Sequence, residues 1–439
     1  MVLRIESMQQ HRKIGWGSAA AIVVANMVGT GVFTTLGLQL KYLQNTWTIL
    51  SVWIIGGLIA LFGAFSYAEL GARLPRSGGE YYFLSKIYHP FVGYLSGWIS
   101  LTVGFAASIA LTAMAMAIYL EPFSAIPKQW IALLTICSIA LAHSFSIRQS
   151  SVFQNCFTVL KLLLLVFLIW MGFQWAPDTH TLDWGSTWKQ EVQETSYAIL
   201  LVYVMYAFSG WNAAAYIVEE IRSPARNLPR ALIGGTILVS VLFIALQLSF
   251  LMQAPPEVLR GKLDIALVVT ERMFGKQAGY IVSLLIALLL IASISAMTWV
   301  GPRVVRAMAD DFQLWQFFGK DNGRGIPVRA IWLQTAISGF MVLTSSFEDV
   351  LLYSGFVLQL FTTLTVAGVI VLRIREGAPQ GYSSPFYPLF QILFLLFSCW
   401  ILIVLIVKEP ANSLMGFINV ALGAGSYWWN RRHEEGSLS

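Results

Sequence analysis

Stretches of about 20 mostly apolar residues recur along almost the whole chain, and a stretch of this length can cross a bilayer as a helix. Because runs such as Leu160–Trp170 are continuously apolar and do not alternate, helices are expected here rather than a β-barrel. The windows therefore predict an all-α integral membrane protein with 12 transmembrane helices. The candidate spans are approximately 15–40, 47–72, 91–120, 128–147, 151–174, 194–219, 230–252, 277–308, 328–345, 349–373, 387–407 and 411–430.

The composition supports one membrane-embedded body. Only 11% of the 439 residues are charged, whereas soluble domains carry about 25%. So few charges cannot coat a soluble enzyme of this size, and no set of catalytic side chains stands out, so no enzymatic activity is expected. The three cysteines lie inside predicted spans, and no His/Cys spacing suggests a metal. We therefore expect no disulfide framework, no metal and no cofactor.

The basic residues are divided unevenly between the connections. If the N-terminus is placed in the cytoplasm, 19 of the 28 Lys and Arg residues fall on that side and 8 on the other, while Lys161 lies within a span. Cytoplasmic loops of membrane proteins carry the excess of Lys and Arg, so both termini are predicted to be cytoplasmic. The net charge of +6 is thereby explained by topology, and nucleic acid is not an expected partner.

Two spans contain small and polar residues where a membrane helix should be regular. The first carries Gly29-Thr30-Gly31, and the sixth carries the run 206–212. Close helix packing is one explanation, but Gly-x-Gly spacing does not place both glycines on one helical face. Five spans precede the second break, so the two halves of the chain have opposite orientations. Paired interruptions of this kind indicate the binding site of a transporter.

The chemistry of a broken helix predicts the ligand. One half-helix end leaves free N–H groups and the other leaves free carbonyls, so a carboxylate binds the first and an ammonium group the second. A ligand that carries both charges close together is an α-amino acid. The expected N–H groups belong to Gly29, Thr30 and Gly31, and the expected carbonyls belong to Met27, Tyr206 and Ser209.

Five segments carry a family resemblance. They are VGTGVF (28–33), YAELGARLPRSGGEYYFLSKIYHPFVGYLSGW (67–98), FTVLKLL (157–163), YAFSGWNAAAYIVEEIRSPARNLPRAL (206–232) and RAMADDFQLWQFF (306–318). Over essentially its full length, the chain resembles the amino acid–polyamine–organocation (APC) superfamily of permeases, and most closely bacterial members of the L-type amino acid transporter branch. The resemblance implies a single transporter domain (1–439) with two inverted five-helix repeats (15–174 and 194–373) and two additional helices (387–430). Helices 1 and 6 would be discontinuous, as in the leucine-transporter-type fold.

The resemblance also implies roles for side chains. Tyr206 stands where the family places an aromatic gate, although the L-type branch usually has Phe there. Tyr206 and Phe208 could instead be packed aromatics, and Met297 and Phe356 could instead belong to the core. The implied substrate side-chain pocket comprises Tyr206, Phe208, Trp211, Asn212, Ser295, Met297 and Phe356.

Lys161 lies about ten residues into the fifth span, roughly 15 Å along the helix, which is too far for easy snorkelling. A charge at that depth costs at least about 2.5–3.5 kcal/mol, so a functional role is expected. The resemblance implies that its ammonium group takes the place of a sodium ion and links the first span near Gly29 to the eighth. A lysine that loses its proton when buried would also suit a proton carrier. Sodium dependence is not expected, and exchange and proton symport both stay open.

Four glutamates lie at or near the cytoplasmic ends of spans. Pairing with nearby arginines would form a cytoplasmic gate, and the alternative is a solvated rim. They are Glu69, Glu80, Glu219 and Glu220, and the candidate partners are Arg73, Arg76, Arg222 and Arg226. None of these acids is expected in the pocket, which favours neutral over cationic substrates.

The most favoured function is therefore sodium-independent secondary transport of neutral L-amino acids by alternating access. A cationic amino acid or polyamine permease and a membrane amino acid sensor without transport are the alternatives. The loop 121–127 lacks the cysteine that joins eukaryotic L-type transporters to a single-span glycoprotein, so no disulfide-linked heavy-chain subunit is expected. The expected partners are a small-molecule substrate, the lipid bilayer and, in the symport case, protons. The expected location is the bacterial inner membrane.

Overall fold

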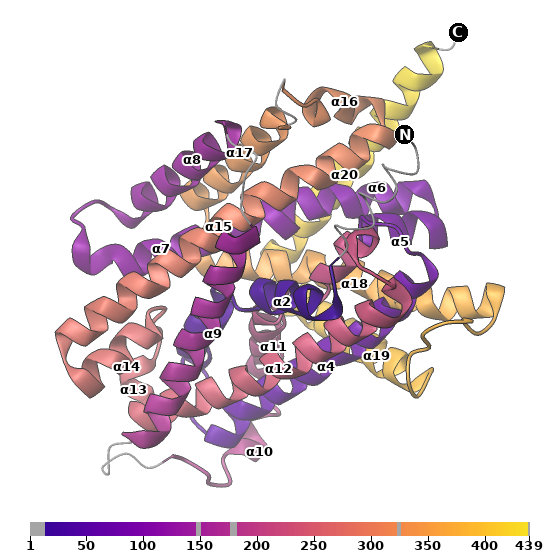
Figure 1. Cartoon of the computed structure of the whole chain (residues 1–439). Coiled ribbons are helices and arrows are strands. Elements are labelled where there is room, and N and C mark those ends of the chain that lie inside the picture. The colour runs from indigo at the N-terminus through magenta and orange to yellow at the C-terminus, as the bar shows by residue number, and fades with distance from the viewer. Residues whose placement is uncertain (1–13, 146–150, 176–181, 323–325, 438–439) are drawn as a thin grey trace.

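The computed structural model describes residues 14–145, 151–175, 182–322 and 326–437, and these residues form a bundle of helices (Figure 1). The only extended pairing among them is an isolated bridge between Ile14 and Ile221. The predicted all-α class is therefore confirmed for the part of the chain that the structure describes.

The helices up to residue 191 are α2 (Trp16–Met27), α3 (Gly31–Gln39), α4 (Thr46–Arg73), α5 (Glu80–Ile87), α6 (Pro90–Ile99), the π-helix η1 (Ser100–Phe105), α7 (Ala106–Leu120), η2 (Glu121–Phe123), α8 (Lys128–Phe145), α9 (Ser151–Gln174) and α10 (Trp188–Glu191). The remaining helices are α11 (Thr195–Ala207), η3 (Ala213–Glu220), α12 (Pro224–Gln253), α13 (Pro256–Leu259), α14 (Ile265–Phe274), α15 (Lys276–Asp311), α16 (Gln313–Gly319), α17 (Val328–Thr344), α18 (Phe347–Glu376), α19 (Leu389–Lys408) and α20 (Pro410–Ser437).

Nine helical stretches among the described residues are long and apolar enough to cross a membrane. Three of the predicted spans, 194–219, 328–345 and 411–430, are not among the nine. The first two coincide with the shorter apolar helices α11 and α17, and the third lies in α20. The total of twelve spans therefore stays a prediction.

The long helices pack around the two broken segments. α12 lies along α4, α2 and α9, whereas α15 lies along α7 (Figure 1). The short helices α10, α13 and α14 gather at one end of the bundle, and α5 and α16 lie toward the other (Figure 1). Large apolar side chains on the outer faces are exposed, among them Leu163 on α9 and Leu396 on α19. Exposed apolar faces of this kind suit contact with lipid.

Both predicted interruptions are present in the structure. Helix α2 ends at Met27 and α3 begins only at Gly31, while α11 ends at Ala207 and η3 begins at Ala213. The two breaks touch each other, because a Cβ on Gly31 would lie 2.5 Å from Ala207 Cα. Gly210 has a φ of +98°, and a Cβ there would lie 2.8 Å from the Asn26 carbonyl carbon. The close approach and the backbone conformation explain why these two positions need glycine.

Candidate functional site

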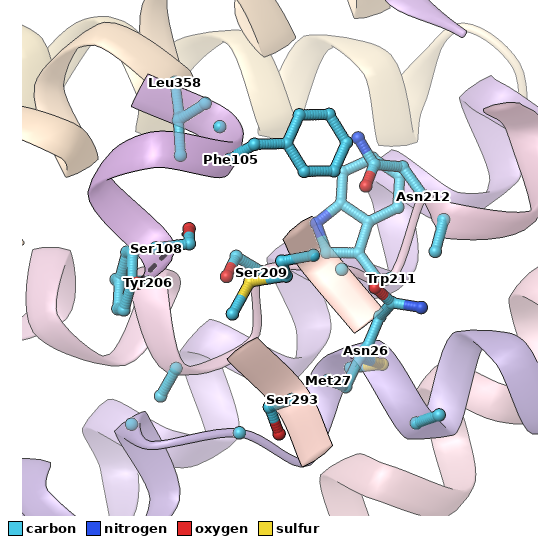
Figure 2. Close-up of a pocket in the computed structure, with 18 of the residues that line it drawn as sticks. Asn26, Met27, Phe105, Ser108, Tyr206, Ser209, Trp211, Asn212, Ser293 and Leu358 are labelled. Carbon is cyan, nitrogen blue, oxygen red and sulfur yellow. Dashed lines mark hydrogen bonds between the residues drawn. The ribbon is translucent and has the colours of Figure 1, made fainter. Parts of the chain in front are cut away.

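A cavity of about 260 Å³ lies between the two breaks. Its walls come from both interrupted segments and from α5, η1, α7, α9, α15, α18 and α19. Figure 2 shows side chains from α2, η1, α7, α11, the second break, α15 and α18 converging on one space. Ten of the residues predicted for the site line the cavity: Met27, Gly29, Thr30, Gly31, Lys161, Tyr206, Ser209, Trp211, Asn212 and Met297.

The first break presents backbone N–H groups at the start of α3. The Gly29 N–H already donates to the Met27 carbonyl at 2.8 Å. Among the described residues, no backbone hydrogen bond engages the N–H of Thr30 or Gly31. The positive end of a helix dipole also lies there. The N–H cluster that could receive a carboxylate thus centres on Thr30 and Gly31 rather than on all three predicted residues.

The opposite helix ends present carbonyls. Helix α2 ends at Met27 and α11 at Ala207, so both direct their C-terminal carbonyls toward the interrupted region. The Tyr206 carbonyl accepts from the Ser209 N–H at 2.9 Å and keeps a second lone pair. Carbonyls and free N–H groups therefore line one cavity, which is the arrangement that a zwitterion requires.

Tyr206 lies at the end of α11, where its ring borders the cavity (Figure 2). The Tyr206 hydroxyl donates to Ser108 Oγ on α7 at 3.4 Å, which is a long contact for a hydroxyl hydrogen bond. The hydroxyl that distinguishes this residue from phenylalanine thus has a partner across the cavity. Ser108 follows the π-helix η1, and π-helical turns are frequent at functional sites.

Trp211 provides an aromatic wall between the second break and α4. Its ring meets Tyr67 edge to face, with centroids 4.7 Å apart. A Cβ on Gly63 would lie 2.7 Å from the indole, so α4 approaches the ring closely. The next residue, Asn212, donates from Nδ2 to Glu80 Oε1 at 3.2 Å. The broken segment is thereby tied both to α4 and to α5.

Three predicted pocket residues point elsewhere. Phe208 is fully buried between Trp53 and Phe243. Ser295 Oγ contacts His143 Nε2 on α8 at 2.9 Å. Phe356 packs against Phe417 on α20. None of the three is among the residues that line the described cavity, so their predicted side-chain contacts with substrate do not agree with their positions.

Other residues take these places. Ser293, two positions before Ser295, lines the cavity, as do Leu358 on α18 and Phe105 on η1 (Figure 2). Glu80 also lines the cavity. This corrects the expectation that none of the four glutamates near the ends of the spans lies in the pocket. No sequence signal separated Glu80 from the other glutamates, because its place depends on how the loop before α5 folds back against the second break.

Lys161 is buried, with 5% of its surface exposed. Its Nζ donates to Ser293 Oγ on α15 at 2.7 Å and lies 3.5 Å from the Ala25 carbonyl on α2. These contacts join the first interrupted helix, α9 and α15 at the cavity. The ammonium group therefore lies in the position where it can neutralise the carbonyl end of α2.

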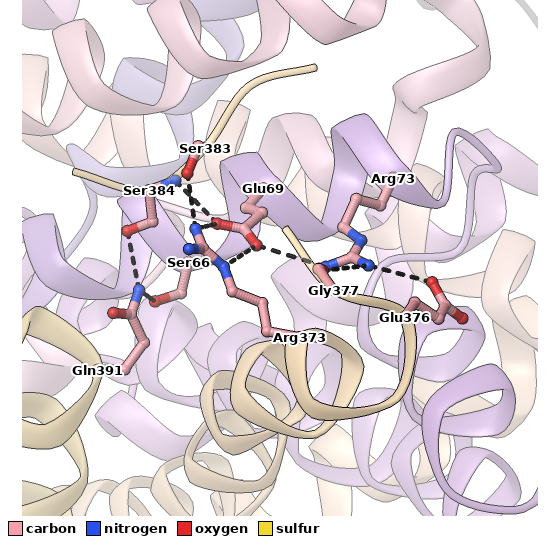
Figure 3. Close-up of polar contacts among 9 residues, drawn as sticks. All are labelled: Ser66, Glu69, Arg73, Arg373, Glu376, Gly377, Ser383, Ser384 and Gln391. Carbon is pink, nitrogen blue, oxygen red and sulfur yellow. Dashed lines mark hydrogen bonds and ion pairs between the residues drawn. The ribbon is translucent and has the colours of Figure 1, made fainter. Parts of the chain in front are cut away.

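Glu69 forms a separate cluster away from the cavity. It is fully buried and accepts two hydrogen bonds from Arg373, at 2.8 Å from Nε and 2.6 Å from Nη2 (Figure 3). The Ser384 N–H donates to it at 2.8 Å, and Arg73 Nη1 lies 3.7 Å away. Among the predicted partners only Arg73 contacts Glu69, and the main partner, Arg373, comes from α18. This cluster fastens α4, α18 and the segment before α19.

The family model described as "Amino acid permease" matches residues 14–425. The chain belongs to the amino acid permease family. With its membrane-spanning helices, it is a multi-pass membrane protein of the APC superfamily.

Curated relatives carry transporter names. The chain is 28% identical to "Large neutral amino acids transporter small subunit 2" of Mus musculus, over 96% of this chain and 82% of the relative. It is 28% identical to "b(0,+)-type amino acid transporter 1" of Homo sapiens, over 91% and 83%. It is 26% identical to "Serine/threonine exchanger SteT" of Bacillus subtilis (strain 168), over 87% and 88%. The family and these names are those of amino acid transporters rather than enzymes.

Proposed function

We propose that this permease moves neutral L-amino acids across the membrane by alternating access, without sodium, as an exchanger or a proton-coupled symporter. The observation that carries the proposal is the meeting of two broken helices at one cavity, with free N–H groups at Thr30 and Gly31 and carbonyls at Met27 and Tyr206. A relative named as a neutral amino acid transporter and another named as a serine/threonine exchanger support the substrate class and the exchange mode.

The same proposal includes the finer architecture. Twelve spans would comprise two inverted repeats of five helices, 15–174 and 194–373, followed by the two helices within 387–430. The positions of the two breaks, each in the first helix of its repeat, support this division. Both termini would be cytoplasmic and the location a bacterial inner membrane. No disulfide-linked heavy chain would be needed.

The neutral substrate class rests on the cavity wall. Trp211, Met297, Phe105, Leu358 and Phe394 give it a largely apolar character. The one carboxylate in the described lining, Glu80, already accepts from Tyr67 and Asn212. A neutral side chain of a substrate is therefore favoured, because it needs no charged partner in this wall.

Transport of cationic amino acids is the second candidate, and Glu80 is the observation that favours it. A buried carboxylate can pair with a substrate ammonium or guanidinium group. A relative named as a b(0,+)-type transporter is consistent with this alternative. Replacing Glu80 by Gln would then abolish arginine and lysine uptake and leave serine and leucine uptake in place.

Uptake of labelled amino acids into proteoliposomes tests the proposal. Serine, alanine, leucine, arginine and putrescine would be compared, with and without internal amino acid, sodium and an acid-outside gradient. We expect neutral amino acids to be taken up without sodium. Dependence on internal substrate would indicate exchange, and dependence on the proton gradient would indicate symport. Uptake of arginine or putrescine alone, or strong sodium dependence, would overturn the proposal.

A further inference from the structure

Glu80 is a buried acid at the start of the short helix α5. Its exposed fraction is 5%. The preceding residue, Gly79, has a φ of +55°, and a Cβ there would lie 2.7 Å from the Tyr216 ring. This glycine therefore permits a close approach that brings the first residue of α5 against η3 and the wall of the cavity.

Three elements surround the Glu80 carboxyl group, and two of them donate hydrogen bonds to it. Tyr67 on α4 donates to Oε1 at 2.5 Å, and Asn212 Nδ2 in the second break donates to the same oxygen at 3.2 Å. Thr362 on α18 also faces the carboxyl group, while its hydroxyl donates to the Leu358 carbonyl at 2.8 Å. Tyr67 and Thr362 belong to long helices, whereas Asn212 belongs to the interrupted segment. Glu80 therefore links a helical frame to the part of the site that alternating access must move.

The charges around Glu80 do not include a paired cation. No salt bridge to Glu80 is found among the described residues. The titratable side chains that face it are Tyr67 on α4 and Tyr216 on η3. On its own helix, Tyr81 turns away to donate to Asp311. Lys161 lines the same cavity from α9 but donates to Ser293.

Burial without a cation favours the neutral form of a carboxyl group. Desolvation raises the pKa of Glu80 to about 7, even though its hydrogen bonds from Tyr67 and Asn212 act to lower it. Protonated and ionised forms are therefore both accessible near neutral pH. When water reaches the carboxyl group, the desolvation is lost and the pKa returns toward its ordinary value.

We propose that Glu80 is a proton-binding site of the transport cycle, which holds its proton while it is packed against Asn212 and releases it when this wall of the cavity opens to water. This inference rests on the proposed transport function. The proton binds the packed arrangement more tightly, so acid favours that arrangement. Between pH 8 and pH 6, a site with a pKa of about 7 changes the ratio of packed to hydrated forms by about tenfold.

Infrared difference spectroscopy of the purified protein between pH 8 and pH 6 tests proton binding directly. We expect a carboxylic-acid carbonyl band that titrates near pH 7 in the wild type and is absent in Glu80→Gln. The exposed carboxylate Glu219 on η3 provides the matched control, and Glu219→Gln should retain the band. Tyr67→Phe removes a donor that favours the ionised form, so it should shift the titration to higher pH even if Glu80→Gln does not fold.

Exchange of labelled amino acid in proteoliposomes tests the role in the cycle. The pH is varied on the side of the membrane from which water reaches Glu80. Wild-type exchange should then be up to about tenfold slower at pH 6 than at pH 8. This difference should disappear in Glu80→Gln and persist in Glu219→Gln. The inference is overturned if no band titrates, or if Glu80→Gln keeps the wild-type pH profile. A wild type that moves no amino acid at any pH contradicts the proposed function instead, and the infrared result would still report the proton.

Discussion

Lys161 on α9 and Ser293 on α15 are joined by a hydrogen bond of 2.7 Å from the lysine ammonium group to the serine hydroxyl oxygen. The same ammonium group lies 3.5 Å from the Ala25 carbonyl on α2. One buried cation thus links the helix that precedes the first break to two helices that cross the bundle. The carbonyl end of α2 carries partial negative charge. A positive charge in this position compensates it.

Replacing Lys161 by Ala is expected to impair transport. The change removes a charged hydrogen bond worth about 1.5–3 kcal/mol, which corresponds to a loss of about tenfold or more in rate if the link acts in the transition between states. Ser293→Ala keeps the ammonium group and should have a smaller effect. Exchange in proteoliposomes measures both, and wild-type rates in Lys161→Ala would assign the lysine a purely structural role.

Substitutions of Gly31 and Gly29 test the packing of the first break, with Gly29 as the control position. A Cβ on Gly31 would lie 2.5 Å from Ala207 Cα, whereas a Cβ on Gly29 meets only the Met27 carbonyl at 4.0 Å. Overpacking costs about 1–3 kcal/mol, so Gly31→Ala should lower the melting temperature and weaken substrate binding. Gly29→Ala should leave the melting temperature nearly unchanged. Equal thermal shifts for the two variants would contradict the contact between the breaks.

The Tyr206 hydroxyl is expected to contribute little to uptake, whereas the Tyr206 ring is expected to contribute strongly. The contact with Ser108 Oγ is 3.4 Å long, so Tyr206→Phe should change uptake by less than about threefold. Tyr206→Ala removes a buried ring beside the cavity, and truncation of a buried aromatic side chain costs about 3–5 kcal/mol. Saturation curves for uptake separate the two variants. A large defect in Tyr206→Phe would show that the hydroxyl has a role in gating or selectivity.

Arg373 is expected to matter for stability through Glu69. Removing the guanidinium group leaves a fully buried carboxylate without its two main donors. Breaking a buried pair in this way costs about 3–5 kcal/mol, so Arg373→Ala should lower the melting temperature strongly. Glu376 pairs with Arg73, but its side chain is 62% exposed, so Glu376→Ala should have a small effect. Similar melting temperatures for Arg373→Ala and the wild type would contradict the network in Figure 3.

The stability of the protein should also depend on pH through Glu80. Burial raises the pKa of Glu80 from 4.5 to about 7, so the folded state binds this proton more tightly than the unfolded state. The stabilisation is complete below the unfolded pKa and is lost progressively as the pH rises to about 7. Glu80→Gln lacks this dependence. Its melting temperature relative to the wild type should therefore rise from pH 5 to pH 7.5, and a constant difference would contradict the raised pKa.

The two breaks could be predicted from the sequence because glycine and polar residues interrupt otherwise regular apolar spans. Residues adjacent to those breaks also reach the cavity, as Trp211 and Asn212 show. Their placement follows from local backbone geometry. Phe208 is the exception, because the turn after α11 directs its ring toward Trp53 and Phe243 instead.

Residues on the long surrounding helices are harder to predict from sequence, because helical phase decides which side chains face inward. Ser293 and Ser295 are two positions apart, which places them on nearly opposite faces of α15. On α18, Gly355, Leu358 and Thr362 share the face toward the cavity, whereas Phe356 faces α20. Helical phase alone does not predict that Glu80 lines the cavity, because α5 reaches the broken segment through a tertiary contact.

Sodium-free counterflow in proteoliposomes tests the central claim most directly. Vesicles loaded with an unlabelled neutral amino acid, such as serine or leucine, would be diluted into trace labelled substrate without sodium. Wild-type protein should accumulate the label transiently, and Gly31→Leu, which fills the space beside Ala207 at the proposed carboxylate site, should not. If wild-type protein shows no counterflow with any neutral amino acid, or if Gly31→Leu retains it, the proposed site and substrate class are contradicted.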